Sequence, residues 1–199
     1  MITTDGPIVQ PTAIVAATAR IGSRTRIWHH VQVADKATIG DDCILGTGCY
    51  IGARSRIGDR VKIGNHCDVF GAIIESEAML SPHVVLTEDP KPRATRPDGQ
   101  PQRPGDWTAR PVTVRRGATL SAGARVAPGV DIGPHALVGI GAVVLRDVPA
   151  HALVLGNPAR QCGWVCHCGH RLTSQLACPR CRRTFELATD RLREQAPAV

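Results

Sequence analysis

The apolar residues of the N-terminal half recur at every sixth position. This series is unbroken over eleven members, which are Val9, Val15, Ile21, Ile27, Val33, Ile39, Leu45, Ile51, Ile57, Ile63 and Val69. A small or apolar residue follows four positions after each of them: Ala13, Ala19, Thr25, Val31, Ala37, Cys43, Cys49, Ser55, Val61, Cys67 and Ile73. A period of six fits neither a helix nor a simple strand alternation. It is typical of a repeat in which a short strand and a turn return each apolar side chain to the inside of a prism.

After Val69 the register slips by one residue, and the series continues at Ile74, Leu80 and Leu86. It then stops over residues 88–111, which contain six prolines and many charges. Proline has no backbone donor and cannot continue the ladder, so this segment is predicted to be a long loop outside the prism. The series resumes at Val114, Leu120, Val126, Ile132, Val138 and Val144, with the small partners Ala118, Ala124, Val130, Ala136, Ala142 and Val148.

The pattern predicts an all-β fold, a parallel β-helix with three strands in each coil. We expect the β-helix to span residues 1–148, with the loop 88–111 protruding from it. Residues 149–164 no longer follow the repeat and are expected to cap the open end of the core. Residues 165–199 have a different composition and form a separate module.

Four cysteines of this module, Cys166, Cys168, Cys178 and Cys181, lie within sixteen residues. The second pair has the Cys-x-x-Cys spacing of a knuckle that presents two thiolates to one zinc ion. The first pair is one residue shorter, which leaves Cys162 or His170 open as a replacement ligand. The pattern predicts a small zinc ribbon in which the metal has a structural role. Cys43, Cys49 and Cys67 occupy inward repeat positions and are interpreted as buried thiols.

Composition narrows the function classes. The chain has 199 residues and a net charge of +7, with 2 Phe, 3 Trp and 1 Tyr. No basic stripe interleaved with aromatic residues and no recognition helix are found, so nucleic acid is not an expected partner. Anionic small ligands, such as coenzyme A or a nucleotide sugar, remain alongside a merely solvated basic surface. No signal peptide or membrane span is recognisable, and a cytoplasmic location is expected.

Several polar residues are predicted to form one column. Residues eighteen apart lie one above another in a three-strand coil, about 4.8 Å apart. His30, Gly48 and His66 share a position, and the slip brings His83 into the same column. Asn65 lies beside it, and Thr87, Glu88 and Asp89 follow at the root of the long loop. This polar column near the loop root is the predicted substrate site.

Five segments carry a resemblance to a known family: RIWHHVQV, KIGNHCDVFGAII, VVLTEDPKPRA, the repeats from Val114 to Pro149 and ALVLGNPARQCGW. They resemble the left-handed β-helix N-acetyltransferases that acetylate an amino nucleotide sugar. The chain is similar to UDP-2-acetamido-3-amino-2,3-dideoxy-glucuronate and dTDP-3-amino-hexose N-acetyltransferases over residues 8–165. The resemblance implies a left-handed β-helix, a homotrimer, and acetyl-CoA bound as co-substrate between neighbouring prisms.

The hypothesis that follows is transfer of an acetyl group to a sugar amine. Asn65, His66, Glu88 and Asp89 are the catalytic candidates, and the substrate-binding candidates are Trp28, His29, His30, His83, Thr87 and Arg93. The coenzyme-binding candidates are Ala122, Gly139, Gly141, Arg146, Asn157 and Arg160. Among them, the backbone N–H groups around Gly139 and Gly141 are candidates for the oxyanion and pantetheine contacts, and Arg146 and Arg160 could meet the phosphates. The zinc ribbon lies outside the resemblance.

Two departures from the family leave the acceptor and the general base open. The family tends to carry paired Asn where this chain has Asn65 and His66, and a Thr-Asn-Asp-like turn at Thr87 to Asp89. His66, Asp89 or Glu88 is the candidate base or ammonium-orienting group, and a weakly basic amine would need little help. The alternatives are a metalloenzyme like γ-carbonic anhydrase, with zinc held by histidines across a trimer interface, and a non-catalytic scaffold.

Overall fold

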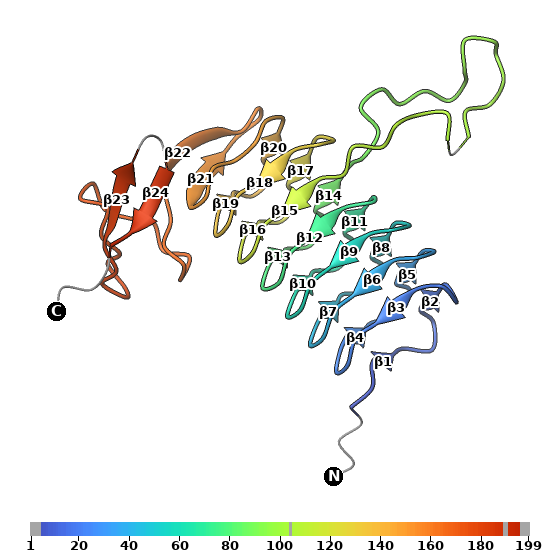
Figure 1. The fold of residues 1–199 in the computed structure, drawn as a ribbon, viewed down its shortest axis with the longest axis horizontal. Coiled ribbons are helices and arrows are strands. Elements are labelled where there is room, and N and C mark those ends of the chain that lie inside the picture. Colours follow the sequence, from blue (N-terminus) through green and yellow to red (C-terminus); the bar gives the residue numbers. More distant parts are fainter. Residues whose placement is uncertain (1–4, 104, 189–190, 196–199) are drawn as a thin grey trace.

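The computed structural model describes residues 5–103, 105–188 and 191–195, and the elements found there are all strands. Twenty strands of two residues each wind into triangular coils that stack along one axis (Figure 1). Residues that follow one another along the axis pair in parallel, as Lys62 does with Ile44. The predicted parallel β-helix is confirmed, and it is left-handed. No helix of the described residues is long and apolar enough to cross a membrane.

The coils form three sheets. Sheet A contains β1 (Ile8–Val9), β4 (Arg26–Ile27), β7 (Ile44–Leu45), β10 (Lys62–Ile63), β13 (Met79–Leu80), β16 (Thr119–Leu120), β19 (Leu137–Val138), β21 (Ala152–Leu155) and β22 (Arg160–Trp164). Sheet B contains β2 (Ile14–Val15), β5 (Gln32–Val33), β8 (Tyr50–Ile51), β11 (Asp68–Val69), β14 (Val85–Leu86), β17 (Arg125–Val126) and β20 (Val143–Val144). Sheet C contains β3 (Arg20–Ile21), β6 (Thr38–Ile39), β9 (Arg56–Ile57), β12 (Ile73–Ile74), β15 (Thr113–Val114) and β18 (Asp131–Ile132).

Three corners connect the sheets. The AB corner comprises residues 28–30, 46–48, 64–66, 81–83, 121–123 and 139–141, and the BC corner residues 34–36, 52–54, 70–71, 127–129 and 145–147. The CA corner comprises residues 22–24, 40–42, 58–60, 75–77, 115–117, 133–135 and 149–151. The last residue of most corner segments has a positive φ, as in His66 at 57° and Arg54 at 61°. Its side chain therefore points outward from the edge, and corner residues are the positions that are free for chemistry.

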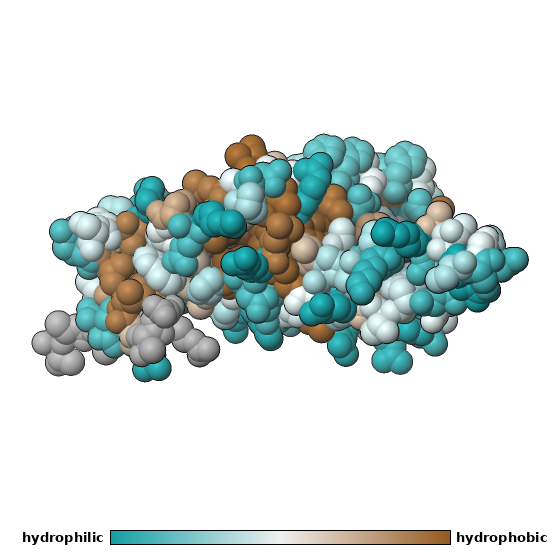
Figure 2. Space-filling model, turned by 90° about the horizontal axis from the view of Figure 1, so that it is seen from above, coloured by the Kyte–Doolittle hydropathy of each residue, from teal (hydrophilic) through white to brown (hydrophobic). Residues whose placement is uncertain are grey.

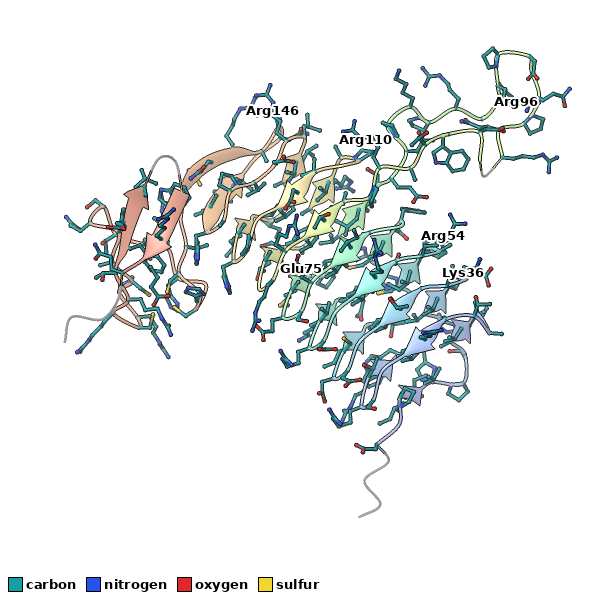
Figure 3. The ribbon with its side chains drawn as sticks, in the orientation of Figure 1. Lys36, Arg54, Glu75, Arg96, Arg110 and Arg146 are labelled. Atoms are coloured by element: carbon teal, nitrogen blue, oxygen red, sulfur yellow. The ribbon has the colours of Figure 1, made fainter. Side chains whose placement is uncertain are left out.

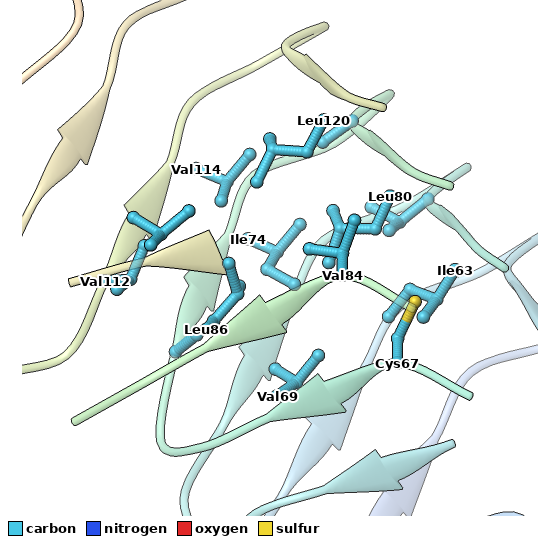
Figure 4. Close-up of a cluster of buried hydrophobic side chains, with 14 of the residues drawn as sticks. Ile63, Cys67, Val69, Ile74, Leu80, Val84, Leu86, Val112, Val114 and Leu120 are labelled. Atoms are coloured by element: carbon cyan, nitrogen blue, oxygen red, sulfur yellow. The ribbon is translucent and has the colours of Figure 1, made fainter. Parts of the chain in front are cut away.

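From Ile27 onward, the inside of the prism holds the predicted apolar series (Figure 4), whereas Val9 in the first coil is exposed. Leu45, Ile63 and Leu80 are at most 1% exposed, and the small partners such as Ala78 and Val84 fill the space between them. Each fully buried aliphatic side chain contributes about 1.5–3 kcal/mol to stability. Scarce aromatic residues are therefore no obstacle to a core of this kind.

The buried cysteines follow the same logic. The Cys43 thiol donates to the Gly58 carbonyl at 3.1 Å, and the Cys49 thiol donates to the Gly64 carbonyl at 2.9 Å. Burial raises the pKa of the Cys43 thiol, which keeps it protonated. The interpretation of these residues as buried thiols agrees with this geometry.

One inward assignment was wrong. Ala72, and not Ile73, is the buried residue of the coil after Val69, because the BC corner there consists only of Phe70 and Gly71 and is one residue shorter than usual. Ile73 faces outward on sheet C and pairs with Arg56. The shortened corner explains the slip of the repeat, since Lys62 pairs with Met79 in the next coil.

The predicted loop leaves the prism after β14 and returns before β15, and Figure 1 shows it extending beyond the coils. It contains a small hairpin, in which Thr95 pairs with Pro101. After the last coil, β21 continues sheet A in parallel next to β19, and β22 turns back antiparallel to β21. The C-terminal hairpin of β23 (Phe185–Ala188) and β24 (Arg191–Glu194) has its own small core, which includes Cys166, Leu172 and Phe185.

Three histidines join this module to the prism. The rings of His135 and His151 at the CA corner stack at 5.2 Å, and the ring of His167 meets them edge-on at 4.1 and 4.6 Å. The Val165 N–H donates to the His151 carbonyl, and the Val165 carbonyl contacts the His151 Nδ1 at 2.9 Å. Burial is the main cause that lowers the pKa of His135 to about 4, and the nearby His167 lowers it further. The junction therefore favours the neutral imidazole.

Replacing Leu45 with Ala should lower the free energy of unfolding by about 2–5 kcal/mol, because it opens a cavity in the aliphatic column. The matched control is Ile44→Ala in the same strand, whose side chain points outward and is 38% exposed. Chemical denaturation of both variants measures the difference. Equal losses of stability would contradict the inward and outward assignment.

Stability should fall as the pH is lowered from about 6.5 toward 4. In that range the unfolded chain binds a proton at His135 that the folded chain does not, so the contribution is complete above the unfolded pKa of 6.5 and is lost below it. The groups facing His135 are His151, His167, Arg116 and Glu77. Denaturation near pH 7 and near pH 5 should show a smaller loss for His135→Gln than for the unmodified chain. An identical loss would exclude His135 as a source of the pH dependence.

Candidate functional site

The predicted histidine column lies at the AB corner. His30, Gly48, His66 and His83 all occupy its last position, with φ between 57° and 70°. The rings of His66 and His83 stack at 5.3 Å, while Gly48 separates His30 from them. A Cβ on Gly48 would lie 2.6 Å from the His66 Nδ1, so the missing side chain makes room for this imidazole. The structure thus gives His66 and His83 one exposed edge, where their rings face solvent.

The same corner continues into the coenzyme candidates. Gly123 and Gly141 follow His83 in the column, since the Gly123 N–H donates to Pro82 and the Gly141 N–H donates to Ala122. Ala122, Gly139 and Gly141 therefore lie further along the edge that carries His66 and His83. Trp28, which is 42% exposed, and His29 lie at the other end of this edge. The His29 Nδ1 contacts the Thr12 hydroxyl at 2.9 Å.

Asn65 has a structural use that its sequence position did not reveal. Its Oδ1 accepts a hydrogen bond from the Thr47 N–H at 3.0 Å. Asp41 and Asp59 make the same bond to the coil below at the CA corner. The side-chain carbonyl of Asn65 is thereby occupied in stacking the coils, which leaves its amide NH2 group available to a ligand.

The loop root lies at the BC corner, across sheet B from the histidines. The Thr87 hydroxyl donates to the Val126 carbonyl at 2.8 Å, and the Asp89 Oδ1 accepts from the Lys91 N–H at 2.8 Å. The half-buried Glu88 carboxylate lies over Gly71, where a Cβ would collide with it. The side chain of Arg93 is exposed and donates to the carbonyl of the adjacent Pro92 at 2.8 Å. Within one chain, His66 and Asp89 therefore occupy neighbouring corners and are not in contact.

Cations follow the BC corner. Figure 3 shows Lys36, Arg54, Arg110 and Arg146 along one edge of the solenoid. At its end, Arg146 and Arg160 line a cavity of about 300 Å³ together with Val144, Leu145 and Ala159. The structure thus brings together the two arginines predicted to meet the coenzyme phosphates. Asn157 is exposed in the turn between β21 and β22.

A larger cleft was not predicted from the sequence. It has a volume of about 760 Å³ and lies between the N-terminal coils and the returning loop. Tyr50 and Phe70 contribute from the coils and Trp107 from the loop, and the cations Lys36, Arg54 and Arg56 also line it. The coil residues occupy outward repeat positions, which is only a weak indication of a binding site. No pattern in the sequence indicates that the loop returns over them.

The four predicted metal ligands converge. The Sγ atoms of Cys166, Cys168, Cys178 and Cys181 lie within 4.8 Å of one another, and the Cys166 and Cys181 sulfurs are 3.4 Å apart. Sulfurs around a tetrahedral zinc ion are separated by about 3.8 Å, so the set fits this metal. The Arg183 backbone N–H lowers the pKa of Cys181 to about 6, which favours the thiolate that a metal needs.

The two alternative ligands differ in position. The His170 Nδ1 lies 3.5 Å from the Cys168 Sγ, at the margin of the cluster. Cys162 is exposed and contacts the Leu153 carbonyl instead. In the described part of the chain, the four cysteines are the only group that gathers three or more potential ligand atoms in this way.

Comparison with known proteins finds matches to the repeat and to an acetyltransferase. Residues 36–67 match the family described as "Bacterial transferase hexapeptide (six repeats)". The chain is 38% identical over 78 residues to a dTDP-3-amino-3,6-dideoxy-alpha-D-galactopyranose 3-N-acetyltransferase of Aneurinibacillus thermoaerophilus. This match covers 38% of the chain and 40% of the relative.

Two solved structures extend the comparison. WeeI of Acinetobacter baumannii AYE has a similar fold, with a TM-score of 0.51 and 22% identity over 77% of this chain and 57% of that one. PerB of Caulobacter crescentus, solved in complex with CoA and GDP-perosamine, is 26% identical over 80% of this chain and 58% of that one, with a TM-score of 0.42. The chain therefore spans less than two thirds of the length of these relatives.

If the cysteine cluster holds zinc, the purified protein should contain about one zinc ion per chain. Replacing both Cys178 and Cys181 with Ser should remove it, because two of four ligands are lost. Elemental analysis by mass spectrometry measures the content, and Cys162→Ser serves as the matched control that should retain the metal. Loss of metal from the control, or its retention by the double variant, would contradict the assigned ligand set.

Proposed function

We propose that this chain is an acetyl-CoA-dependent N-acetyltransferase that acts on the amino group of a nucleotide-linked amino sugar. One observation supports the proposal. The residues that the sequence and the resemblance assign to this reaction flank the outer face of sheet B, except for Asn157 and Arg160 in the cap. The histidines and coenzyme glycines lie on its AB side, and the loop root and Arg146 lie on its BC side. The match to an aminosugar N-acetyltransferase supports the same chemistry.

The reaction requires an unprotonated amine, alignment of the two reactants and a place for the developing oxyanion. The amine nitrogen forms a bond to the acetyl carbonyl carbon, the bond from that carbon to sulfur breaks, and coenzyme A leaves as its thiol after the ammonium proton is transferred. The imidazole of His66 is the group at the AB corner that takes up this proton. His83, stacked on it, restricts the orientation of the His66 ring.

The other side chains of the site position the acceptor sugar. The Asn65 amide NH2 group lies beside His66 and offers donors to sugar hydroxyls. Asp89 supplies a carboxylate that orients an ammonium group, and it lies across sheet B from His66. A neighbouring copy that brings its loop root to this face would complete the set. We therefore propose a homotrimer in which each reaction site lies between two prisms.

Apolar side chains on the surface support association. Ile140 and Leu145 are 78% and 57% exposed and flank sheet B in its last coil. Figure 2 shows an apolar area in the middle of the upper face, bordered by polar residues. Large exposed patches of this kind mark interaction sites more often than free surface.

The coenzyme is placed along the last coils. Backbone N–H groups near Gly139 and Gly141 are suited to the thioester carbonyl and the pantetheine amides. Arg146 and Arg160 line a single cavity and supply positive charge for the phosphates. The acceptor is either a UDP-linked 3-amino-glucuronate or a dTDP-linked 3-amino-hexose in this proposal, and His66 in place of a family Asn distinguishes the present site.

A carbonic-anhydrase-like reaction has less support. Such a site needs three imidazoles around one metal ion. His30 is separated from His66 by the coil of Gly48, and the described residues gather potential ligands only at the cysteines. The ribbon is therefore assigned a structural zinc and takes no part in the proposed reaction.

Turnover of a panel of UDP-, dTDP- and GDP-linked amino sugars with acetyl-CoA, followed by release of free thiol, tests the proposal. Replacing His66 with Ala should lower kcat at least about tenfold, because proton transfer loses its acceptor. The matched control is Lys62→Ala, an exposed residue of the same coil on sheet A, which should turn over normally. No thiol release with any acceptor would reject the function, and unchanged kcat in His66→Ala would remove this residue from the mechanism.

A further inference from the structure

The cleft between the N-terminal coils and the long loop has the chemistry of a nucleotide site. Its volume of about 760 Å³ falls in the range of about 300–1,000 Å³ that is typical of small-molecule sites. It opens at the BC corner and is lined by three aromatic side chains and three cations. None of the groups assigned above to acetyl transfer, apart from Glu88, contributes to it.

The aromatic residues of the cleft come from two separate segments of the chain. Tyr50 and Phe70 belong to successive coils, and their rings lie 5.3 Å apart at an angle of 50°. Trp107 comes from the returning loop. Its neighbour Asp106 accepts a hydrogen bond from the Arg103 N–H at 2.7 Å and lies 3.7 Å from Arg96, which holds this part of the loop in place. A planar ring system is the ligand that fits between such faces.

The cations are available to a ligand. Lys36 and Arg54 occupy the same corner position in successive coils, and Figure 3 shows them at one edge of the solenoid. Arg56 lies on the outer face of sheet C next to them. Across the described residues, these three side chains take part in no ion pair. Unpaired guanidinium groups side by side are suited to a diphosphate.

Two carboxylates, those of Asp35 and Glu88, also line the cleft, and Asp35 accepts a hydrogen bond from the Thr18 hydroxyl. The half-buried Glu88 carboxylate lies over Gly71, and a side chain on Gly71 would displace it. A carboxylate beside an aromatic base site is suited to the hydroxyl groups of a ribose. The aromatic residues suit the base, the Glu88 carboxylate suits the ribose and the three cations suit the diphosphate. The cleft therefore has a group for each part of a nucleoside diphosphate.

We propose that this cleft binds a nucleoside diphosphate, with the base between Trp107 and the pair Tyr50 and Phe70, and the diphosphate on Lys36, Arg54 and Arg56. That this ligand is the nucleotide half of the acceptor rests on the proposed function. The cleft lies in the N-terminal coils, whereas the coenzyme candidates lie in the last ones. From Phe70 to His66 the chain crosses one face of the prism, about 13 Å. Lys36, Arg54 and Arg56 lie beyond the aromatic pair as seen from these histidines, so a diphosphate bound there lies at the end of this face that is away from this chain's own His66.

Calorimetric titration of the full chain with UDP, dTDP and GDP tests the proposal without any acetyl transfer. Trp107→Ala and Arg56→Gln should each weaken the bound diphosphate about tenfold or more, and Trp107→Phe should retain most of the affinity. Arg26→Gln is the matched control, because Arg26 begins a two-residue strand as Arg56 does but lies on sheet A. Affinity that is unchanged in Trp107→Ala and Arg56→Gln, or no binding of any of the three diphosphates or of coenzyme A, would overturn it.

Coenzyme A also contains a nucleoside diphosphate, and a second titration separates the sources. If the cleft serves the acceptor, coenzyme A should bind with equal affinity to the unmodified chain and to Trp107→Ala. If coenzyme A shows the same sensitivity as UDP, dTDP or GDP, the cleft takes a nucleoside diphosphate but belongs to the donor. Diphosphate binding without thiol release would leave this inference standing and reject the proposed function. Thiol release with an acceptor KM that is unchanged in both cleft variants would reject this inference and leave the proposed function standing.

Discussion

The whole structure depends on aliphatic side chains that return to one axis every six residues. Each coil buries its inward residues only against the coils above and below, so the fold is held by contacts between near neighbours along the stack. Backbone hydrogen bonds follow the same direction, as in the pairing of Lys62 with Ile44 and Met79. Because strands of two residues cannot be stable alone, register between coils decides the position of every outward side chain.

That register turns corners into functional edges. The last residue of a corner takes a left-handed conformation, and non-glycine residues there are tolerated because stacking fixes the backbone. His66 and His83 on one edge, and Lys36 and Arg54 on another, become neighbours in space although about eighteen residues separate them. A solenoid thereby aligns chemistry along an edge without any long-range loop, and sheet B, between the two edges, becomes the face on which a long ligand can lie.

The sequence was sufficient for the repeat, the slip, the loop and the cysteine cluster, because each has a local signal of period or spacing. It misplaced Ile73, since a shortened corner shifts the inward position to Ala72 without changing the apolar pattern. It could not place Trp107 over Tyr50, because the path of a proline-rich loop is set by contacts and not by periodicity. It also missed the contact of His167 with His135 and His151, which depends on how the C-terminal module meets the last coil. The roles of Asn65, His66 and Asp89 stay predictions.

The junction of the two modules shows how a metal-binding segment can matter to a reaction that does not use the metal. The N–H of Val165, next to Cys166, donates to the His151 carbonyl in the last CA corner. β21 and β22, which precede the ribbon, close the end of sheet A and supply Arg160 to the cavity that also contains Arg146. A ribbon ordered by its cysteines therefore anchors the end of β22. Since Arg160, one of the two proposed phosphate contacts of the coenzyme, begins that strand, we expect metal binding to influence coenzyme affinity through β22.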